Sequence, residues 1–166
     1  MKRSSQKSQS SLNKHLSARE GDRSPMPPTL ERRFPMPEKD IKICDMSTAS
    51  LAYLGDCVIE LFVRERLTVS GISSSKNLNR EALRFVSAPS QAAAVRNIFD
   101  SLTDEEAGYF RRGKNLAHMN VPKNATPAEY RAATGMETLF GFLHLSGNTE
   151  RARELFALAY PEETDN

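Results

Sequence analysis

The chain has 166 residues, of which 39% are hydrophobic and 27% are charged, and its formal net charge is +2. This composition is typical of one soluble domain with a hydrophobic core. It excludes a membrane-spanning helix, because no stretch approaches the roughly 18 consecutive apolar residues that a span needs. The two cysteines, Cys44 and Cys57, follow no metal-binding spacing and indicate reduced thiols.

Residues 1–40 differ from the rest of the chain in composition. They are rich in Ser and Pro and carry nine basic and five acidic side chains, leaving fourteen and sixteen in residues 41–166. Such a segment cannot bury enough apolar area to offset its loss of conformational entropy, so we expect a disordered tail followed by one folded domain. Three interpretations of the tail remain: a plain solvated tail, which we favour, an electrostatic arm for RNA phosphates, or an organelle transit peptide.

The hydrophobic pattern after the tail is helical. Apolar side chains recur every three or four residues after Leu51, which predicts an amphipathic helix over residues 48–67 that stops at residues 70–71. Asn77 is expected to cap a second helix. Pro89 suits the first turn of a third helix, where its missing N–H group is not needed.

The second half of the chain contains clearer helix starts. Residues 103–106 read Thr-Asp-Glu-Glu, a capping box that predicts a helix ending near Gly113. Residues 126–129 read Thr-Pro-Ala-Glu and open another helix in the same way. A last helix is expected within residues 148–161. No segment shows the sustained polar–apolar alternation of a strand, so the predicted fold class is all-α.

Two carboxylates lie in unusual surroundings. Asp56 falls in the middle of the first predicted helix and Glu137 in the middle of a later one, both among apolar neighbours. A buried carboxylate is costly unless it is paired, protonated or bound to a metal. Either residue could simply face solvent, but two inward-facing acids would form an oxygen site suited to magnesium or manganese. Glu60, one turn after Asp56, could extend such a site, although an ion pair with Arg64 is favoured.

Basic residues are concentrated in one later stretch, residues 111–131, in which only Glu129 is acidic. These basic residues are Arg111, Arg112, Lys114, Lys123 and Arg131. The stretch also contains a long predicted loop over about residues 115–125. A basic loop beside a two-carboxylate metal site suits phosphodiester chemistry, because the cations hold the polyanion while the metal activates water. Cations attracted to a helix C-terminus would explain the first three residues but not the last two.

Six segments together carry a resemblance to a known family. Residues 51–56, LAYLGD, resemble the signature helix of the ribonuclease III catalytic domain. Five later segments are similar, in order and spacing, to the Mini-ribonuclease III branch: residues 86–92, 112–115, 122–124, 130–131 and 133–143. The resemblance covers about residues 45–160. It implies the helical ribonuclease III endonuclease fold and a homodimer that cuts double-stranded RNA with a divalent metal, without a separate RNA-binding domain.

The resemblance also implies roles for particular residues. Asp56 and Glu137 match the catalytic, metal-binding carboxylates, with Mg²⁺ as the expected ion and Mn²⁺ as a substitute. The RNA-contacting region corresponds to Arg111, Arg112, Lys114, Asn115, Lys123, Asn124 and Arg131. Full-length ribonuclease III has two further metal-site acids, at positions held here by Ala52 and Thr134, and uncharged residues there are typical of the Mini-ribonuclease III branch. The family's usual RGRN is RGKN here, which keeps the charge but loses a guanidinium fork.

The cellular role follows from the same resemblance. It implies maturation of a large-subunit ribosomal RNA precursor in a bacterial-type cytoplasm, or in a plastid if residues 1–40 are a transit peptide. Products would carry a 5′ phosphate and a 3′ hydroxyl. One alternative is a non-catalytic, ribosome-associated RNA-binding protein of the same fold, which the presence of both acids opposes. Another is a helical protein–protein adaptor, which leaves the mid-helix acids and the basic loop unexplained.

Overall fold

The computed structural model describes residues 42–116 and 121–162. Its elements are η1 (Ile43–Asp45), α2 (Thr48–Val69), α3 (Ser75–Val86), α4 (Ala88–Ile98), η2 (Phe99–Ser101), α5 (Asp104–Lys114), α6 (Pro127–Leu145) and α7 (Thr149–Ala159). These ranges contain no strand, which confirms the all-α prediction. Nor does any helix within them have the length and apolar character needed to cross a bilayer. The predicted disordered tail, residues 1–40, lies outside the described residues.

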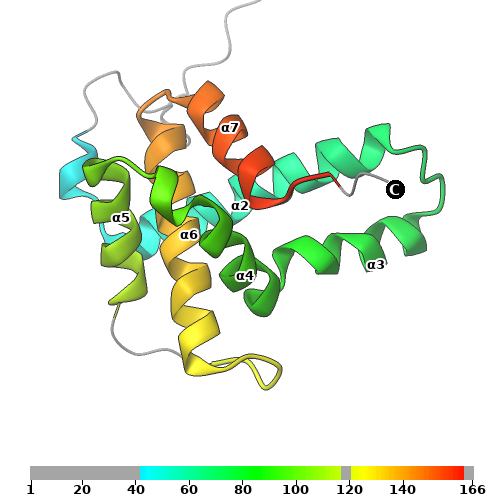
Figure 1. The fold of residues 1–166 in the computed structure, drawn as a ribbon, viewed down its shortest axis with the longest axis horizontal. Coiled ribbons are helices and arrows are strands. Elements are labelled where there is room, and N and C mark those ends of the chain that lie inside the picture. The colour runs from blue at the N-terminus through cyan, green and yellow to red at the C-terminus, as the bar shows by residue number, and fades with distance from the viewer. Residues whose placement is uncertain (1–41, 117–120, 163–166) are drawn as a thin grey trace, which may run out of the picture. The chain divides into compact units, whose positions relative to one another are not determined.

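Helix α6 forms the centre of the fold, and α2, α4 and α5 pack directly against it (Figure 1). Ten of its 19 residues are buried, which is the pattern of a helix covered on most sides. Three phenylalanines join it to α2 and α7: the ring centroid of Phe62 lies 6.4 Å from Phe140 and 5.5 Å from Phe156, both edge to face. The core therefore holds α2 and α6 in a fixed relation.

Two glycines allow α2 and α6 to approach very closely. A Cβ atom at Gly55 would collide with the backbone carbonyl of Glu137, and one at Gly141 would collide with the carbonyl of Leu51. Only glycine permits this contact between two helix backbones. Because Asp56 directly follows Gly55, the crossing sets it beside the turn of α6 that carries Glu137.

A third glycine, Gly113, holds α5 close to the turn of α6 that carries Glu137. A Cβ atom at Gly113 would collide with the hydroxyl of Thr138 and come within 2.5 Å of the carbonyl oxygen of Thr134. These two threonines lie on either side of Glu137 in the sequence, and the Thr138 hydroxyl donates to the Thr134 carbonyl at 2.7 Å. The RGKN motif that contains Gly113 is therefore held beside the helical turn of the second acid.

The predicted helix starts were confirmed, with one exception. Both capping boxes are present, at Thr103 and at Thr126, and α2 gives way at Gly71, whose φ is +81°. The cap predicted at Asn77 is wrong, because α3 begins at Ser75. The backbone N–H of Leu78 already donates to the carbonyl of residue 74 at 2.9 Å, and its side chain packs against the core.

Candidate active site

The two predicted acids lie on either side of the α2–α6 crossing and interact through their charges. Glu137 is partly buried, and this burial, together with the negative charge of Asp56, raises its pKa from 4.5 to about 7. Asp56 is more exposed, yet partial burial and then the charge of Glu60 also raise its pKa above the usual value. The sequence left open whether each acid faces inward or faces solvent. In the structure Glu137 is partly buried and Asp56 is exposed.

Glu60 is held in the ion pair that the sequence favoured. The Nη2 atom of Arg64 lies 3.1 Å from its Oε2 atom, one helical turn further along α2. This pair is exposed, so it contributes little stability, but it leaves the Glu60 carboxylate directed along the helix surface. Glu60 thus remains a neighbour of Asp56 that acts through its charge.

The two positions that hold acids in full-length ribonuclease III are occupied in this chain by small, uncharged and buried residues. Ala52 is 7% exposed and Thr134 is 3% exposed. The Thr134 hydroxyl donates to the carbonyl of Tyr130 at 3.1 Å, so it is already used within α6. Within residues 42–116 and 121–162, no three His, Cys, Asp or Glu side chains come together as a metal site. Within the described residues, the acidic site therefore consists of the carboxylates of Asp56 and Glu137.

These two carboxylates fit a divalent cation by their chemistry. Neither Asp56 nor Glu137 forms an ion pair or side-chain hydrogen bond with any residue in the described part of the chain. Each is nevertheless desolvated, and their proximity disfavours the charged state of Glu137. A cation between them would relieve this repulsion. Mg²⁺ in particular often takes one or two carboxylates and fills its other positions with water and phosphate oxygens.

The basic stretch divides into exposed side chains and one that is tied into the fold. The exposed members are Arg111, Lys114, Asn115, Lys123, Asn124 and Arg131. Residues 117–120, in the middle of the predicted loop, lie outside the described residues. The exposed cations lie at the end of α5, in the segment before α6 and in the first turns of α6. They are free to meet a polyanion without first giving up a buried contact.

Arg112 is the member that is tied into the fold. Its Nη2 atom donates to the carbonyl oxygen of Met46 at 3.0 Å, just before α2 begins. Its guanidinium lies over the ring of Tyr109 at 5.1 Å, and that ring stacks on Phe142 at 3.9 Å. The sequence analysis missed this role, although the spacing of three residues between Tyr109 and Arg112 places both on one helix face.

Comparison with known proteins shows the family of this chain. Residues 49–148 match the family model of the ribonuclease III domain. The chain is 46% identical over 110 residues to Mini-ribonuclease 3 of Symbiobacterium thermophilum, covering 66% of this chain and 85% of that protein. The chain belongs to the Mini-ribonuclease III family. It is also 35% identical over 133 residues to the Clostridium tetani Mini-ribonuclease 3, covering 78% of this chain and 87% of that protein.

A solved structure shares the fold of this Mini-ribonuclease III. The crystal structure of a Fusobacterium nucleatum protein matches with a TM-score of 0.64 and 28% sequence identity, covering 70% of this chain and 93% of that chain. Family membership makes this chain an endoribonuclease of the ribonuclease III type. The family acts on double-stranded RNA and generally uses a divalent metal.

Proposed function

We propose that this Mini-ribonuclease III cleaves double-stranded RNA at the acid pair Asp56 and Glu137, which hold Mg²⁺, with Mn²⁺ as a substitute. The observation that carries this is the pair itself: two desolvated carboxylates that form no ion pair within the described residues and are brought together where Gly55 and Gly141 let α2 and α6 cross closely. A bound divalent ion supplies water activation and charge stabilisation at the phosphate. The products are expected to carry a 5′ phosphate and a 3′ hydroxyl.

The protonation state of Glu137 sets the pH range of this site. With a pKa of about 7, its carboxyl is about half protonated at neutral pH. A carboxylate must be deprotonated to act as a metal ligand, so ion binding releases this proton and becomes stronger as pH rises. Asp56 has a smaller barrier to ionisation because it is more exposed. Asp56 and Glu137 would both hold the ion, and Glu137 would have to lose its proton to do so.

The exposed basic residues are proposed to hold the RNA backbone next to the acids. Gly113 packs α5 against the turn of α6 that carries Glu137, so Lys114 follows directly at the end of α5 on that side of the fold. Lys123 and Arg131 add charge from the far side of the predicted loop. Contacts of this kind bind phosphates without reading the sequence, which suits an enzyme that acts on duplex RNA.

We further propose that the active unit is a homodimer. Tyr53 and Leu61 on α2 are 80% and 51% exposed, and the exposed Cys57 lies between them at the same helical spacing. Exposed apolar side chains of this size mark a contact surface, and it lies on the helix that carries Asp56. A two-fold pairing of this surface gives two acid sites in one particle, as the cutting of both strands of a duplex requires.

The natural substrate is proposed to be a precursor of large-subunit ribosomal RNA in the cytoplasm of a bacterial-type cell. The support for this is the family resemblance of residues 45–160. A plastid location would require residues 1–40 to act as a transit peptide. These proposals can be tested with processing assays on candidate precursors and with tagged full-length protein.

The central experiment is cleavage of generic double-stranded RNA with and without Mg²⁺. Asp56→Asn and Glu137→Gln each keep the side-chain volume while removing the charge that holds the ion, so each is expected to abolish cleavage. Glu60→Gln is the matched control, because Glu60 lies one turn away in an exposed ion pair and should leave cleavage largely intact. If the wild-type protein binds RNA but never cuts it with Mg²⁺ or Mn²⁺, the non-catalytic alternative is correct instead.

A further inference from the structure

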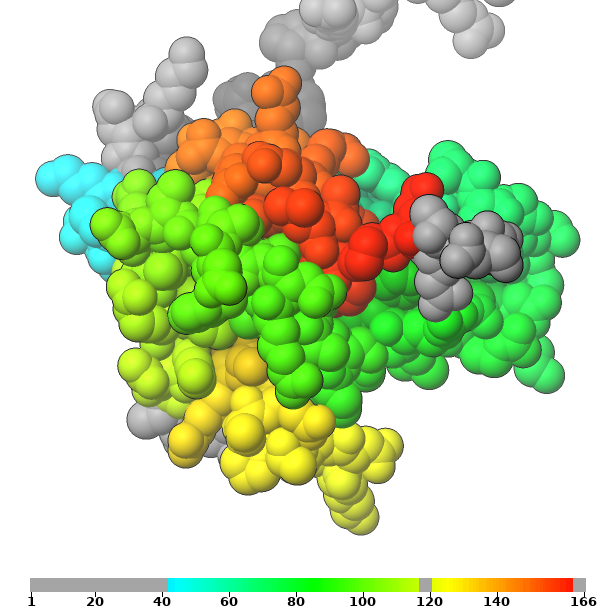
Figure 2. Space-filling view, in the orientation of Figure 1, coloured from blue at the N-terminus to red at the C-terminus, as the bar shows by residue number. Residues whose placement is uncertain are grey.

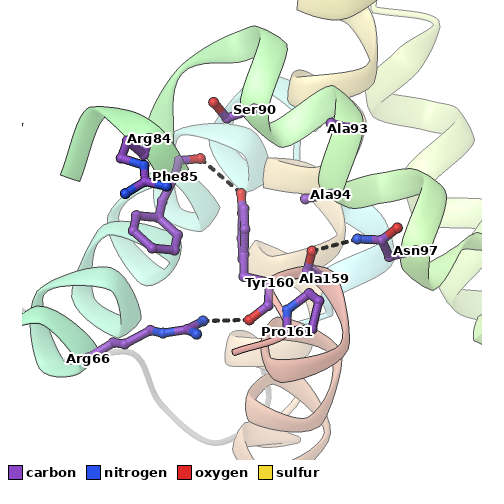
Figure 3. A pocket seen from close by; sticks show the side chains of 10 residues that line it. All are labelled: Arg66, Arg84, Phe85, Ser90, Ala93, Ala94, Asn97, Ala159, Tyr160 and Pro161. Atoms are coloured by element: carbon purple, nitrogen blue, oxygen red, sulfur yellow. Dashed lines mark hydrogen bonds between the residues drawn. The ribbon is translucent and has the colours of Figure 1, made fainter. Parts of the chain in front are cut away.

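A pocket lies away from the acid pair, between the C-terminal half of α2, the end of α3, α4 and the residues at and after the end of α7 (Figure 3). Its volume is about 480 Å³, within the range of pockets for small ligands. Figure 2 shows the end of α7 and the following residues, in red, lying against the green surface of α3 and α4. Arg66, which lines the pocket, is ten residues after Asp56 on α2, roughly 15 Å along the helix.

The lining of this pocket is positively charged. It contains two arginines, Arg66 and Arg84, and no aspartate or glutamate. The Nη1 atom of Arg84 lies 3.1 Å from a carboxylate oxygen of Glu81, outside the lining. Arg66 has no carboxylate partner among residues 42–116 and 121–162, whereas its helix neighbour Arg64 is paired with Glu60. Arg66 is therefore the principal uncompensated charge that faces the pocket.

The guanidinium of Arg66 is held in one orientation. Nη1 donates to the carbonyl oxygen of Tyr160, and the guanidinium carbon lies 5.5 Å from the centre of the Phe85 ring (Figure 3). Phe85 is fixed in turn, because the Tyr160 hydroxyl donates to its carbonyl at 2.9 Å and the two rings meet edge to face at 5.3 Å. The remaining N–H donors of Arg66 thus form a preorganised group beside the pocket.

We propose that this pocket binds a phosphate group, with Arg66 as its main donor. Guanidinium donors match the geometry of phosphate oxygens, and a fixed guanidinium loses little freedom on binding. The pocket volume accommodates a nucleoside monophosphate. The phosphate belongs either to a free nucleotide or to an RNA strand that extends beyond the acid site, and both sources present the same chemistry. The proposal stands independently of catalysis at Asp56 and Glu137.

The test measures binding of inorganic phosphate, AMP and adenosine to the full chain by calorimetry. Ala93 is exposed and lines the pocket, so Ala93→Glu adds a carboxylate to the pocket wall, and Ala93→Gln is the neutral control of nearly equal size. We expect phosphate and AMP to bind the wild-type protein and adenosine to fail. Ala93→Glu should weaken AMP binding at least tenfold, while Ala93→Gln changes it less than twofold.

A second pair of variants tests the donor itself. Arg66→Met keeps the length of the side chain but removes the guanidinium, and should also weaken AMP binding at least tenfold. Arg80→Met removes an exposed arginine of α3 that is paired with Glu81, and should leave it unchanged. Thermal unfolding of each variant shows whether its fold is intact, and Ala93→Glu remains decisive if Arg66→Met unfolds.

Two results would overturn the proposal: no binding of phosphate or AMP by the wild-type protein, or equal AMP affinities for Ala93→Glu and Ala93→Gln. The second result would place any bound phosphate elsewhere, for example on the basic stretch. Duplex RNA then identifies the source of the phosphate. A weaker duplex affinity for Ala93→Glu than for Ala93→Gln assigns the site to an RNA strand, and equal duplex affinities assign it to a free nucleotide.

Discussion

Replacing Glu137 by glutamine is expected to stabilise the fold at alkaline pH although it abolishes cleavage. In the folded chain, burial and the charge of Asp56 raise the pKa of Glu137 from 4.5 to about 7. Below pH 4.5 the carboxyl is protonated in both folded and unfolded chains, so it has no effect on their balance. Between these two pKa values the unfolded chain loses its proton first. Stability therefore falls as pH rises, and the loss is complete above pH 7.

The size of this effect follows from the pKa shift. Each pKa unit corresponds to about 1.4 kcal/mol, so the carboxylate reduces the free energy of unfolding by about 3 kcal/mol at pH 8. At pH 5 the reduction is below about 1 kcal/mol, because this pH lies only half a unit above the pKa of the unfolded chain. Glutamine avoids the charge and loses no side-chain hydrogen bond, because Glu137 forms none with the described residues. For a domain of this size the gain corresponds to roughly 10 °C in melting temperature at pH 8.

Thermal unfolding followed by circular dichroism, in buffer with a chelator, measures this difference at pH 5 and pH 8. Glu60→Gln is the control, because its exposed ion pair with Arg64 predicts no comparable gain at pH 8. Adding Mg²⁺ at pH 8 should raise the melting temperature of the wild-type protein more than that of Glu137→Gln. The reasoning is refuted if Glu137→Gln differs from the wild type by the same amount at both pH values.

Four further predictions concern the other parts of the site. Asp56→Asn should abolish cleavage. By removing the charge next to Glu137 it should also lower the pKa of Glu137 in the folded chain, so the loss of stability with rising pH becomes smaller and ends at a lower pH, which a pH series of melting curves would show. Lys123→Ala should weaken binding of duplex RNA and reduce the slope of log affinity against log salt by about one, with a smaller effect on cleavage at saturating RNA. Arg112→Met should instead lower kcat and melting temperature more than RNA affinity, because the Arg112 guanidinium joins α5 to Met46, just before α2 begins. A selective loss of RNA affinity in binding titrations would contradict this and show that Arg112 contacts RNA. Tyr53→Asp should give a monomer in sedimentation, whereas a chain that begins at about residue 39 should remain a dimer and cleave duplex RNA at moderate salt.

The helix starts could be predicted where the signal is local. The capping boxes at Thr103 and Thr126 depend on side chains three residues apart, so the sequence alone specifies them. Asn77 was misassigned because packing of Leu78 against the core places the first turn of α3 earlier. The position of Leu78 against the core depends on residues that are distant in the sequence, so the residues around Asn77 alone do not indicate where α3 begins.

The site could be predicted in composition but not in arrangement. The mid-helix positions of Asp56 and Glu137, among apolar neighbours, marked them as candidates. The division of the basic stretch could not be foreseen, because the bond from Arg112 to the carbonyl of Met46 spans 66 residues of sequence. From charge alone, Arg112 and its neighbour Arg111 are equivalent, and only the fold shows that Arg112 is hydrogen-bonded to Met46 while Arg111 is exposed.

The acid pair shows how the fold supports a site that opposes its own stability. A loss of about 3 kcal/mol is a large part of the 5–15 kcal/mol by which a typical domain is stable. The buried faces of α6 and the contact between Gly55 and Gly141 must offset it, since neither acid gains a partner within the described residues. The proposed divalent cation would need both carboxylates held together, which happens only in the folded chain. If the pair holds a cation as proposed, ion binding and folding would be linked: the burial and charge repulsion that raise the pKa of Glu137 in the metal-free protein would be offset by the bound ion.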